Sequence, residues 1–158
     1  MSVPDRKLGV FPAFHKVAGR RVVVVGGGVE AAAKIRLLAE TSAEIVVYAV
    51  ALERQTGADL IAAGGEWRGG EPGLADLTGA ALVFAATGSE ESDRAIHALA
   101  HQAGVPVNVV DRPDLCDFYT PAIVNRAPLA VAVCSEGVAP VLSRHVRARI
   151  EAMLSPAF

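Results

Sequence analysis

Cysteine is scarce in this chain of 158 residues, and its two cysteines lie far apart. Cys116 and Cys134 form no C-x-x-C pair, so their spacing suits neither a disulfide framework nor a zinc site. A chain of this length can bury a sizeable hydrophobic core without disulfides or metal. We therefore expect a fold held by its core, in the reducing environment of the cytoplasm.

The chain also lacks a long hydrophobic run and an excess of charge of one sign. Its apolar stretches, such as VVVV and AALVFAA, are much shorter than the roughly 18 residues of a membrane span. The N-terminus contains no continuous apolar segment of the kind found in signal peptides. The net charge is −2, which argues against a general nucleic-acid binder. We expect neither a membrane nor a nucleic acid among its partners.

Short apolar runs alternate with segments of helical spacing through the first two thirds of the chain. The runs read as buried strands at 20–25, 44–50, 81–86 and 105–110, with a shorter strand at 65–67. Helices are predicted after the first strand and over 52–65 and 89–104, where Ser89 is the expected N-cap. Alternation of this kind indicates βαβ units and a parallel sheet. The sequence therefore predicts an α/β fold with a Rossmann-like sheet over residues 1–113.

The pattern changes after Asp111. Segments 118–126 and 128–134 read as extended with no helix between them, and the break Ala127-Pro128 suits a hairpin or a crossing pair. A helix follows, with Pro140 at its first position. We predict that residues 114–158 form a small β-rich unit with a C-terminal helix.

A glycine-rich loop joins the first strand to the first helix. In VVVVGGGVEAAAK, the residues Gly26, Gly28 and Ala31 fit the pattern G-x-G-x-x-G/A. Gly26 allows a tight turn, Gly28 lets the backbone approach a pyrophosphate, and the helix N-terminus offers N–H groups to the phosphates. A tight turn with no ligand is the alternative. No carboxylate stands near Tyr48 to hold a ribose, and no arginine follows the second strand until Arg54, which favours NAD over NADP.

Polar residues follow the later strands. Thr87 ends the strand at 81–86, and Asn108 and Asp111 lie within and just beyond the strand at 105–110. Ligands of open α/β sheets lie outside the carboxyl ends of the strands, so we expect Gly28, Thr87 and Asp111 to meet at one crevice. The alternatives are a helix cap for Thr87, a backbone-bonded buried amide for Asn108, and a type I turn for Asp111.

Several segments together carry a family resemblance. They are FPAF, VVVVGGGVEAAAKIRLL, FAAT, NVVD and CDFYTPAIVNRAPLAVAVCSEGVAPVLSRHVR, in order over nearly the whole chain. With them the chain resembles the precorrin-2 dehydrogenase / sirohydrochlorin ferrochelatase module of siroheme synthase. The resemblance implies NAD-dependent dehydrogenation of precorrin-2 to sirohydrochlorin, followed in many members by insertion of ferrous iron. It also implies a homodimer formed through the β segment that follows the Rossmann-like part.

The resemblance also assigns residues. The acid of the NVVD motif is Asp111, which it implies to be catalytic both in oxidation and in metal insertion. The cofactor and substrate positions that it implies are Val29, Glu30, Val50, Ala51 and Ser135. The family usually has Ser-Pro at the start of the last helix, and this chain has Ala139-Pro140 there.

Arginines are further candidates for binding a substrate rich in carboxylates. Arg144 and Arg147 are three residues apart on one predicted helix face, and Arg126 precedes the β run. A solvated helix face is the alternative for the pair. No cluster of histidine, cysteine and carboxylates has metal-ligand spacing, so we expect no resident metal. A non-catalytic NAD-binding regulatory module is the alternative function, although it gives Asp111 and the C-terminal segment no role.

Overall fold

The chain divides into two compact units in the computed structural model, which describes residues 7–156. The sheet unit is Val17–Tyr119, and the hairpin unit joins the described residues up to Lys16 with those from Thr120 onward. The division falls after Tyr119, beyond the predicted end at residue 113. The reason is that Leu115, Cys116 and Phe118 pack against the core of the sheet unit.

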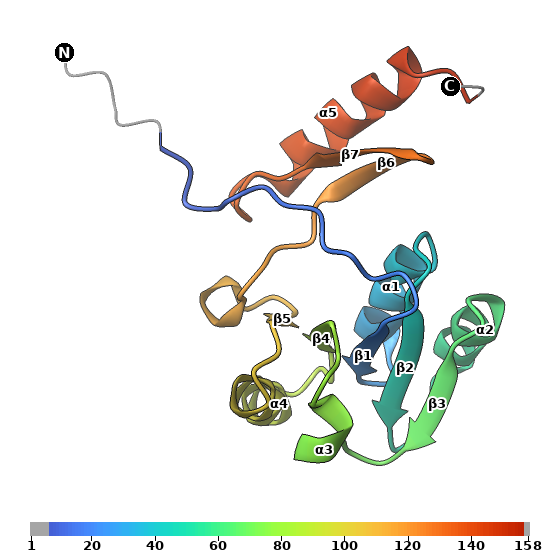
Figure 1. Ribbon diagram of the computed structural model, residues 1–158, viewed down its shortest axis with the longest axis vertical. Coiled ribbons are helices and arrows are strands. Elements are labelled where there is room, and N and C mark those ends of the chain that lie inside the picture. Colours follow the sequence, from blue (N-terminus) through green and yellow to red (C-terminus); the bar gives the residue numbers. More distant parts are fainter. Residues whose placement is uncertain (1–6, 157–158) are drawn as a thin grey trace. The chain divides into compact units, whose positions relative to one another are not determined.

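The sheet unit contains a parallel sheet with helices between its strands (Figure 1). Its strands are β1 (Arg21–Val25), β2 (Glu44–Ala49), β3 (Glu66–Gly69), β4 (Leu82–Ala85) and β5 (Val107–Val109). Its helices are α1 (Val29–Leu38), α2 (Arg54–Ala62), α3 (Leu74–Leu77) and α4 (Glu90–Gln102), with the 3₁₀ helix η1 (Pro113–Leu115). The strand order is β3-β2-β1-β4-β5. The order in which successive strands are added reverses between β1 and β4, as in Rossmann-like nucleotide-binding sheets, while all five strands stay parallel.

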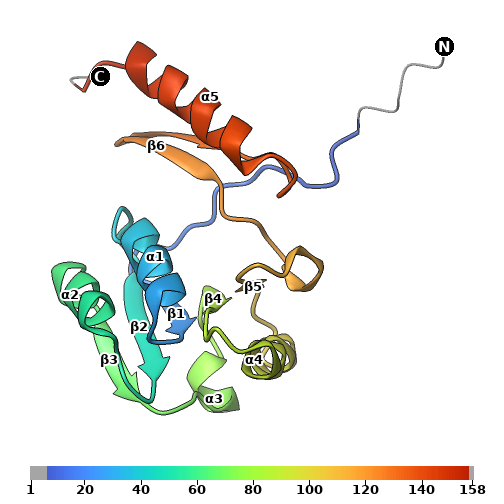
Figure 2. The same ribbon diagram turned by 180° about the vertical axis from the view of Figure 1, so that it is seen from behind.

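Both faces of the sheet are buried, which explains the unbroken apolar run of β1. Val22 and Val24 pack with residues of α1 and α2, whereas Val23 and Val25 pack with residues of α3 and α4. The two pairs of helices lie on opposite sides of the sheet (Figure 2). All four valines are at most 3% exposed, as expected for a strand covered on both faces.

Capping residues confirm most of the predicted helix positions and explain the differences. The Ser89 hydroxyl accepts the N–H of Ser92 at 3.3 Å, so α4 begins where the sequence predicted. The helix predicted over 52–65 is shorter, Arg54–Ala62, and Gly64 follows it with a φ of 68°. The short α3 was not predicted. Four residues carry too little periodicity, although the Asp76 carboxylate accepts the Gly73 N–H at 2.7 Å and caps it.

The hairpin unit consists of two antiparallel strands and a helix. Strands β6 (Ala122–Arg126) and β7 (Leu129–Val133) are joined at Ala127-Pro128, with Arg126 paired to Leu129. Helix α5 (Pro140–Met153) contacts both strands. The hairpin and the helix were predicted, but regular pairing begins at Ala122 and not at residue 118. Within residues 7–156, no helix is long and apolar enough to span a bilayer.

Candidate functional site

Two glycines of the loop after β1 are fixed by neighbouring backbone. Gly26 has a φ of 138°, and a Cβ built on it would overlap the carbonyl oxygen of Ala86 at the end of β4. A Cβ on Gly27 would overlap the carbonyl oxygen of Ala51, just beyond β2. The Gly26 N–H also donates to the Tyr48 carbonyl at 2.9 Å. The loop is therefore clamped between the carboxyl ends of β2 and β4.

The third glycine of the loop, Gly28, is not packed against neighbouring backbone. A Cβ on Gly28 would meet only the Glu53 carboxylate, at 3.3 Å, and Gly28 is the N-cap of α1 without a side-chain cap. The Thr56 hydroxyl donates to the Gly28 carbonyl at 3.0 Å and holds the loop against α2. The first N–H groups of a helix have no intrahelical acceptors and favour phosphate oxygens. This cradle fits the diphosphate of a dinucleotide.

A cavity of about 220 Å³ opens beside this loop. The predicted cofactor residues that line it are Gly26, Val50, Ala51 and Thr87. It extends past the ends of β1, β2 and β3, with Glu71 on its wall. The remaining predicted cofactor residues lie at the start of α1 or on β5: Gly28, Val29, Glu30 and Asn108. The cavity therefore borders the ends of β1, β2, β3 and β4, and Asp111 follows the remaining strand, β5.

Thr87 and Asn108 each have a structural hydrogen bond. The Thr87 hydroxyl donates to the buried Asp93 carboxylate at 2.7 Å, and the Thr87 N–H donates to the same oxygen at 3.0 Å. Thr87 therefore binds the first turn of α4 through Asp93 and also lines the cavity. The Asn108 amide is 5% exposed and donates to the Phe118 carbonyl at 2.9 Å. This bond is the backbone role that the sequence left open for Asn108, and it fixes the segment after η1.

Asp111 lies in a tight turn at the end of β5. Its φ is 59°, a conformation that aspartate tolerates better than most residues, and the Arg112 N–H donates to the Val109 carbonyl at 3.2 Å. A turn is therefore present, although its positive φ at Asp111 differs from the type I geometry considered from the sequence, and it leaves the Asp111 side chain exposed beyond the strand. The residue is a carboxylate at the same sheet edge as the glycine loop.

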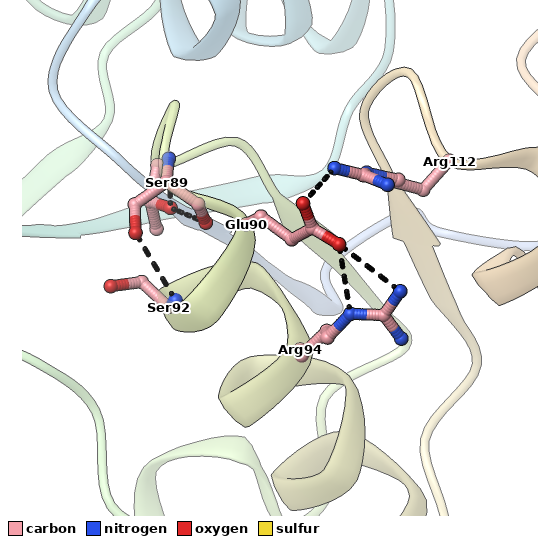
Figure 3. Close-up of polar contacts among 6 residues, drawn as sticks. Ser89, Glu90, Ser92, Arg94 and Arg112 are labelled. Atoms are coloured by element: carbon pink, nitrogen blue, oxygen red, sulfur yellow. Dashed lines mark hydrogen bonds and ion pairs between the residues drawn. The ribbon is translucent and has the colours of Figure 1, made fainter.

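The Asp111 turn is tied to α4 through Glu90. Arg112 forms an ion pair of 2.6 Å with Glu90, whose other oxygen accepts two hydrogen bonds of 3.2 Å from Arg94 (Figure 3). Hydrogen bonds from Arg94 and Arg112 hold the pKa of Glu90 below its ordinary value. The ionised carboxylate therefore links the residue after Asp111 to the first turn of the helix.

Three predicted substrate residues lie in the hairpin unit, where two of them bond within that unit. Arg126 donates to the carbonyls of Leu154 and Glu151 at 3.4 and 3.5 Å, at the end of α5. The Ser135 hydroxyl accepts the Ala139 N–H at 3.1 Å, and Ala139 leaves the start of α5 without a side-chain cap. Arg144 is exposed on α5. All three remain predictions as substrate residues.

A family model described as "Putative NAD(P)-binding" matches residues 13–122. The chain belongs to this family. The membership confirms the predicted Rossmann-like fold and the nicotinamide dinucleotide cofactor, in agreement with the glycine cradle described above.

The chain is also similar to siroheme synthases in sequence and to one solved structure in fold. A siroheme synthase of Stutzerimonas stutzeri (strain A1501) is 47% identical over 93% of this chain, and one of Pseudomonas fluorescens (strain Pf0-1) is 49% identical over 89%. These matches cover 32% and 30% of the two relatives, so the chain spans about a third of their length. The solved structure of "SirC, precorrin-2 dehydrogenase" superposes with a TM-score of 0.76 at 22% identity, covering 93% of this chain and 72% of that one. The resemblance to the siroheme synthase family is confirmed.

Some residues of this NAD(P)-binding site were not predicted. Gly27 was passed over because the G-x-G pattern treats its position as free, although three consecutive glycines signal an unusually close backbone approach. Glu71 lies on the cavity wall only because β3 ends beside β2, which no local pattern shows.

Proposed function

We propose that this chain catalyses the NAD-dependent dehydrogenation of precorrin-2 to sirohydrochlorin. The observation that carries the proposal is the presentation of Asp111 at the sheet edge that also holds the glycine cradle. The similarity to siroheme synthases over most of the chain supports this substrate. The name of the structural neighbour, precorrin-2 dehydrogenase, agrees with it.

NAD is the proposed form of the cofactor. Val50 and Ala51 line the cavity at the end of β2 and offer no cation to a 2′-phosphate. Glu71 lies on the same wall, and a carboxylate there disfavours a second negative charge. Dinucleotides with a free 2′-hydroxyl should therefore bind more tightly than their 2′-phosphorylated forms.

The chemistry divides between cofactor and protein. Dehydrogenation removes two electrons and one proton from the substrate as a hydride, which bound NAD accepts. A second proton must leave the substrate, and the Asp111 carboxylate is proposed to accept it. The N–H groups of the first turn of α1 would hold the diphosphate of the dinucleotide, which would supply the hydride acceptor.

Insertion of ferrous iron is proposed as a second activity of the chain. In insertion of ferrous iron into sirohydrochlorin, Asp111 would accept protons from pyrrole nitrogens, a step tested separately by supplying sirohydrochlorin and ferrous iron. Within residues 7–156, no group of three histidine, cysteine, aspartate or glutamate side chains is placed to hold a metal ion.

The proposed location of the protein is the cytoplasm, where Cys116 and Cys134 stay reduced. Fractionation of the native cells tests this location.

A homodimer is proposed through the hairpin unit. A two-stranded sheet is marginally stable by itself, and β6 and β7 have only each other as partners within the described chain. Val138, Val141 and Leu142 expose their side chains around the start of α5. Light scattering is expected to give twice the chain mass of 16.4 kDa, and a monomer mass at micromolar concentration would contradict the dimer.

Turnover under strictly anaerobic conditions tests the proposed function. The chain is mixed with precorrin-2 and with either NAD or NADP, and the sirohydrochlorin spectrum is recorded. We expect turnover with NAD and slower turnover with NADP at equal concentrations. A chain that binds NAD but leaves precorrin-2 unchanged would support a regulatory module and contradict the proposal.

A further inference from the structure

The turn after β2 brings a carboxylate to the glycine loop. Glu53 lies four residues beyond β2 and is the N-cap of α2, the helix that packs beside α1 (Figure 2). Its Oε1 lies 3.3 Å, and its Cδ 3.7 Å, from the position that a Cβ on Gly28 would occupy. The Glu53 carboxylate therefore stands at the open side of the cradle that fits the diphosphate.

The backbone around Glu53 is fixed to the same loop. The Glu53 N–H donates to the Gly27 carbonyl at 2.8 Å, and the buried Thr56 hydroxyl donates to the Gly28 carbonyl at 3.0 Å. The Gly57 N–H donates to the Glu53 carbonyl at 2.9 Å and begins α2. These bonds place Glu53 beside Gly28 without using its carboxylate.

The Glu53 side chain does not cap its own helix. Acids at an N-cap commonly accept an N–H group of the first helical turn. Glu53 makes no such bond, and its backbone is extended, with a φ of −61° and a ψ of 153°. The side chain is exposed and its carboxylate lies next to Gly28 instead. Replacing the Glu53 side chain therefore removes no capping bond from α2.

A carboxylate at this place supplies what the end of β2 lacks. In dinucleotide-binding sheets, an acid near the end of the second strand hydrogen-bonds the 2′-hydroxyl of the ribose. Tyr48 occupies the usual position, and its side chain is buried in the sheet unit. Glu53 is five residues further along the chain, yet the turn through Val50 and Ala51 returns it to the glycine loop. Because the adenosine ribose is bonded directly to the diphosphate, an acid beside the diphosphate cradle lies beside that ribose.

From this geometry we propose that Glu53 binds the adenosine ribose of NAD and selects against a 2′-phosphate. The carboxylate accepts hydrogen bonds from the ribose hydroxyls, and such bonds to a charged group are stronger than those between neutral groups. The same negative charge repels a phosphate on the 2′-oxygen. Glu71 on the cavity wall adds to this repulsion but is assigned no hydrogen bond to the ribose. The inference rests on the NAD form of the cofactor in the proposed function, and on no property of Asp111.

A binding experiment on the free chain tests this role without precorrin-2. The wild type and Glu53→Ala are titrated calorimetrically with NAD, with NADP and with NAD that lacks the adenosine 2′-hydroxyl. The wild type should bind the 2′-deoxy form about tenfold more weakly than NAD, because a hydrogen bond to a charged group is lost. Glu53→Ala should bind NAD about tenfold more weakly than the wild type does, and should bind NAD and its 2′-deoxy form equally. This loss of preference, and not the loss of affinity alone, reports a direct contact between Glu53 and the hydroxyl.

Neighbouring charges supply matched controls. Arg54→Ala removes the adjacent exposed cation of α2 and should leave all three affinities within about twofold of the wild type. Glu71→Gln removes the charge on the cavity wall and should keep the preference for the 2′-hydroxyl. Glu53→Gln keeps the shape of the side chain and should raise the affinity for NADP, relative to that for NAD, by roughly tenfold. The midpoint of urea unfolding should be unchanged in both Glu53 variants, because α2 loses no cap.

The outcomes separate this proposal from the proposed function. A folded Glu53→Ala chain that still prefers NAD to its 2′-deoxy form by about tenfold would overturn the role of Glu53, even if the wild type converts precorrin-2. Loss of that preference in Glu71→Gln but not in Glu53→Ala would move the ribose contact to Glu71 and overturn the proposal as well. Loss of the preference in Glu53→Ala alone, in a chain that never converts precorrin-2, would support the role of Glu53 and overturn the proposed function.

Discussion

Gly26→Ala is expected to destabilise the sheet unit by roughly 2–5 kcal/mol, because a side chain at a φ of 138° is strained and its Cβ overlaps the Ala86 carbonyl. The overlap is with backbone just beyond β4, an inner strand that cannot move without breaking its pairing with β1. The free energy of unfolding measured in urea checks this result.

Gly28→Ala is the matched control for this prediction. A Cβ at Gly28 meets only the end of the Glu53 side chain, at 3.3 Å, so the variant should lose about 1 kcal/mol or less. Its methyl group would stand where the backbone approaches the diphosphate, so NAD affinity should fall about tenfold or more, a loss of at least about 1.4 kcal/mol. Equal destabilisation by both substitutions, or unchanged NAD affinity in Gly28→Ala, would contradict this account of the loop.

Asp111→Asn is expected to lower kcat for precorrin-2 dehydrogenation by about 10²–10⁴, the usual contribution of a positioned general base. Asparagine tolerates the φ of 59° as well as aspartate does, so the turn and the ion pair between Arg112 and Glu90 should persist. The binding of NAD should therefore change little. Steady-state kinetics, with NAD affinity measured by fluorescence titration, separates the two effects.

Asp114→Asn serves as the control for Asp111. Asp114 is an exposed acid in η1, close to Asp111 in the chain but outside the turn. Its replacement should leave kcat within about twofold of the wild type, since surface substitutions change little. Wild-type turnover in Asp111→Asn would remove the catalytic role from Asp111 without affecting the assignment of the cofactor loop.

The sheet unit could be predicted from the sequence because its signals are local. The run Val22–Val25 is buried on both faces, so apolar character alone identified β1. Gly26 was recognised because the glycine pattern follows a strand and precedes a helix, and its φ of 138° agrees with the tight turn expected there. The strand, the turn and the helix are each specified within a few residues of the sequence.

The positions of several side chains could not be predicted, because they depend on contacts between residues far apart in the sequence. Phe118 was assigned to the second unit because segment 118–126 reads as extended, yet its ring packs against Phe84 and the core of the sheet unit. Asn108 was predicted at the cofactor, with a backbone-bonded amide as the alternative, and its amide donates to the Phe118 carbonyl. The position of Lys34 over Phe84 follows from how α1 lies on β4, which the spacing of apolar residues does not determine.

The stoichiometry of a single anaerobic reaction tests the central claim most directly. The chain is given excess NAD and limiting precorrin-2, and NADH and sirohydrochlorin are measured in the same sample. We predict one NADH for each sirohydrochlorin formed, with both products lost together in Asp111→Asn. Sirohydrochlorin formed without NADH, or no conversion by a chain that binds NAD, would contradict the account.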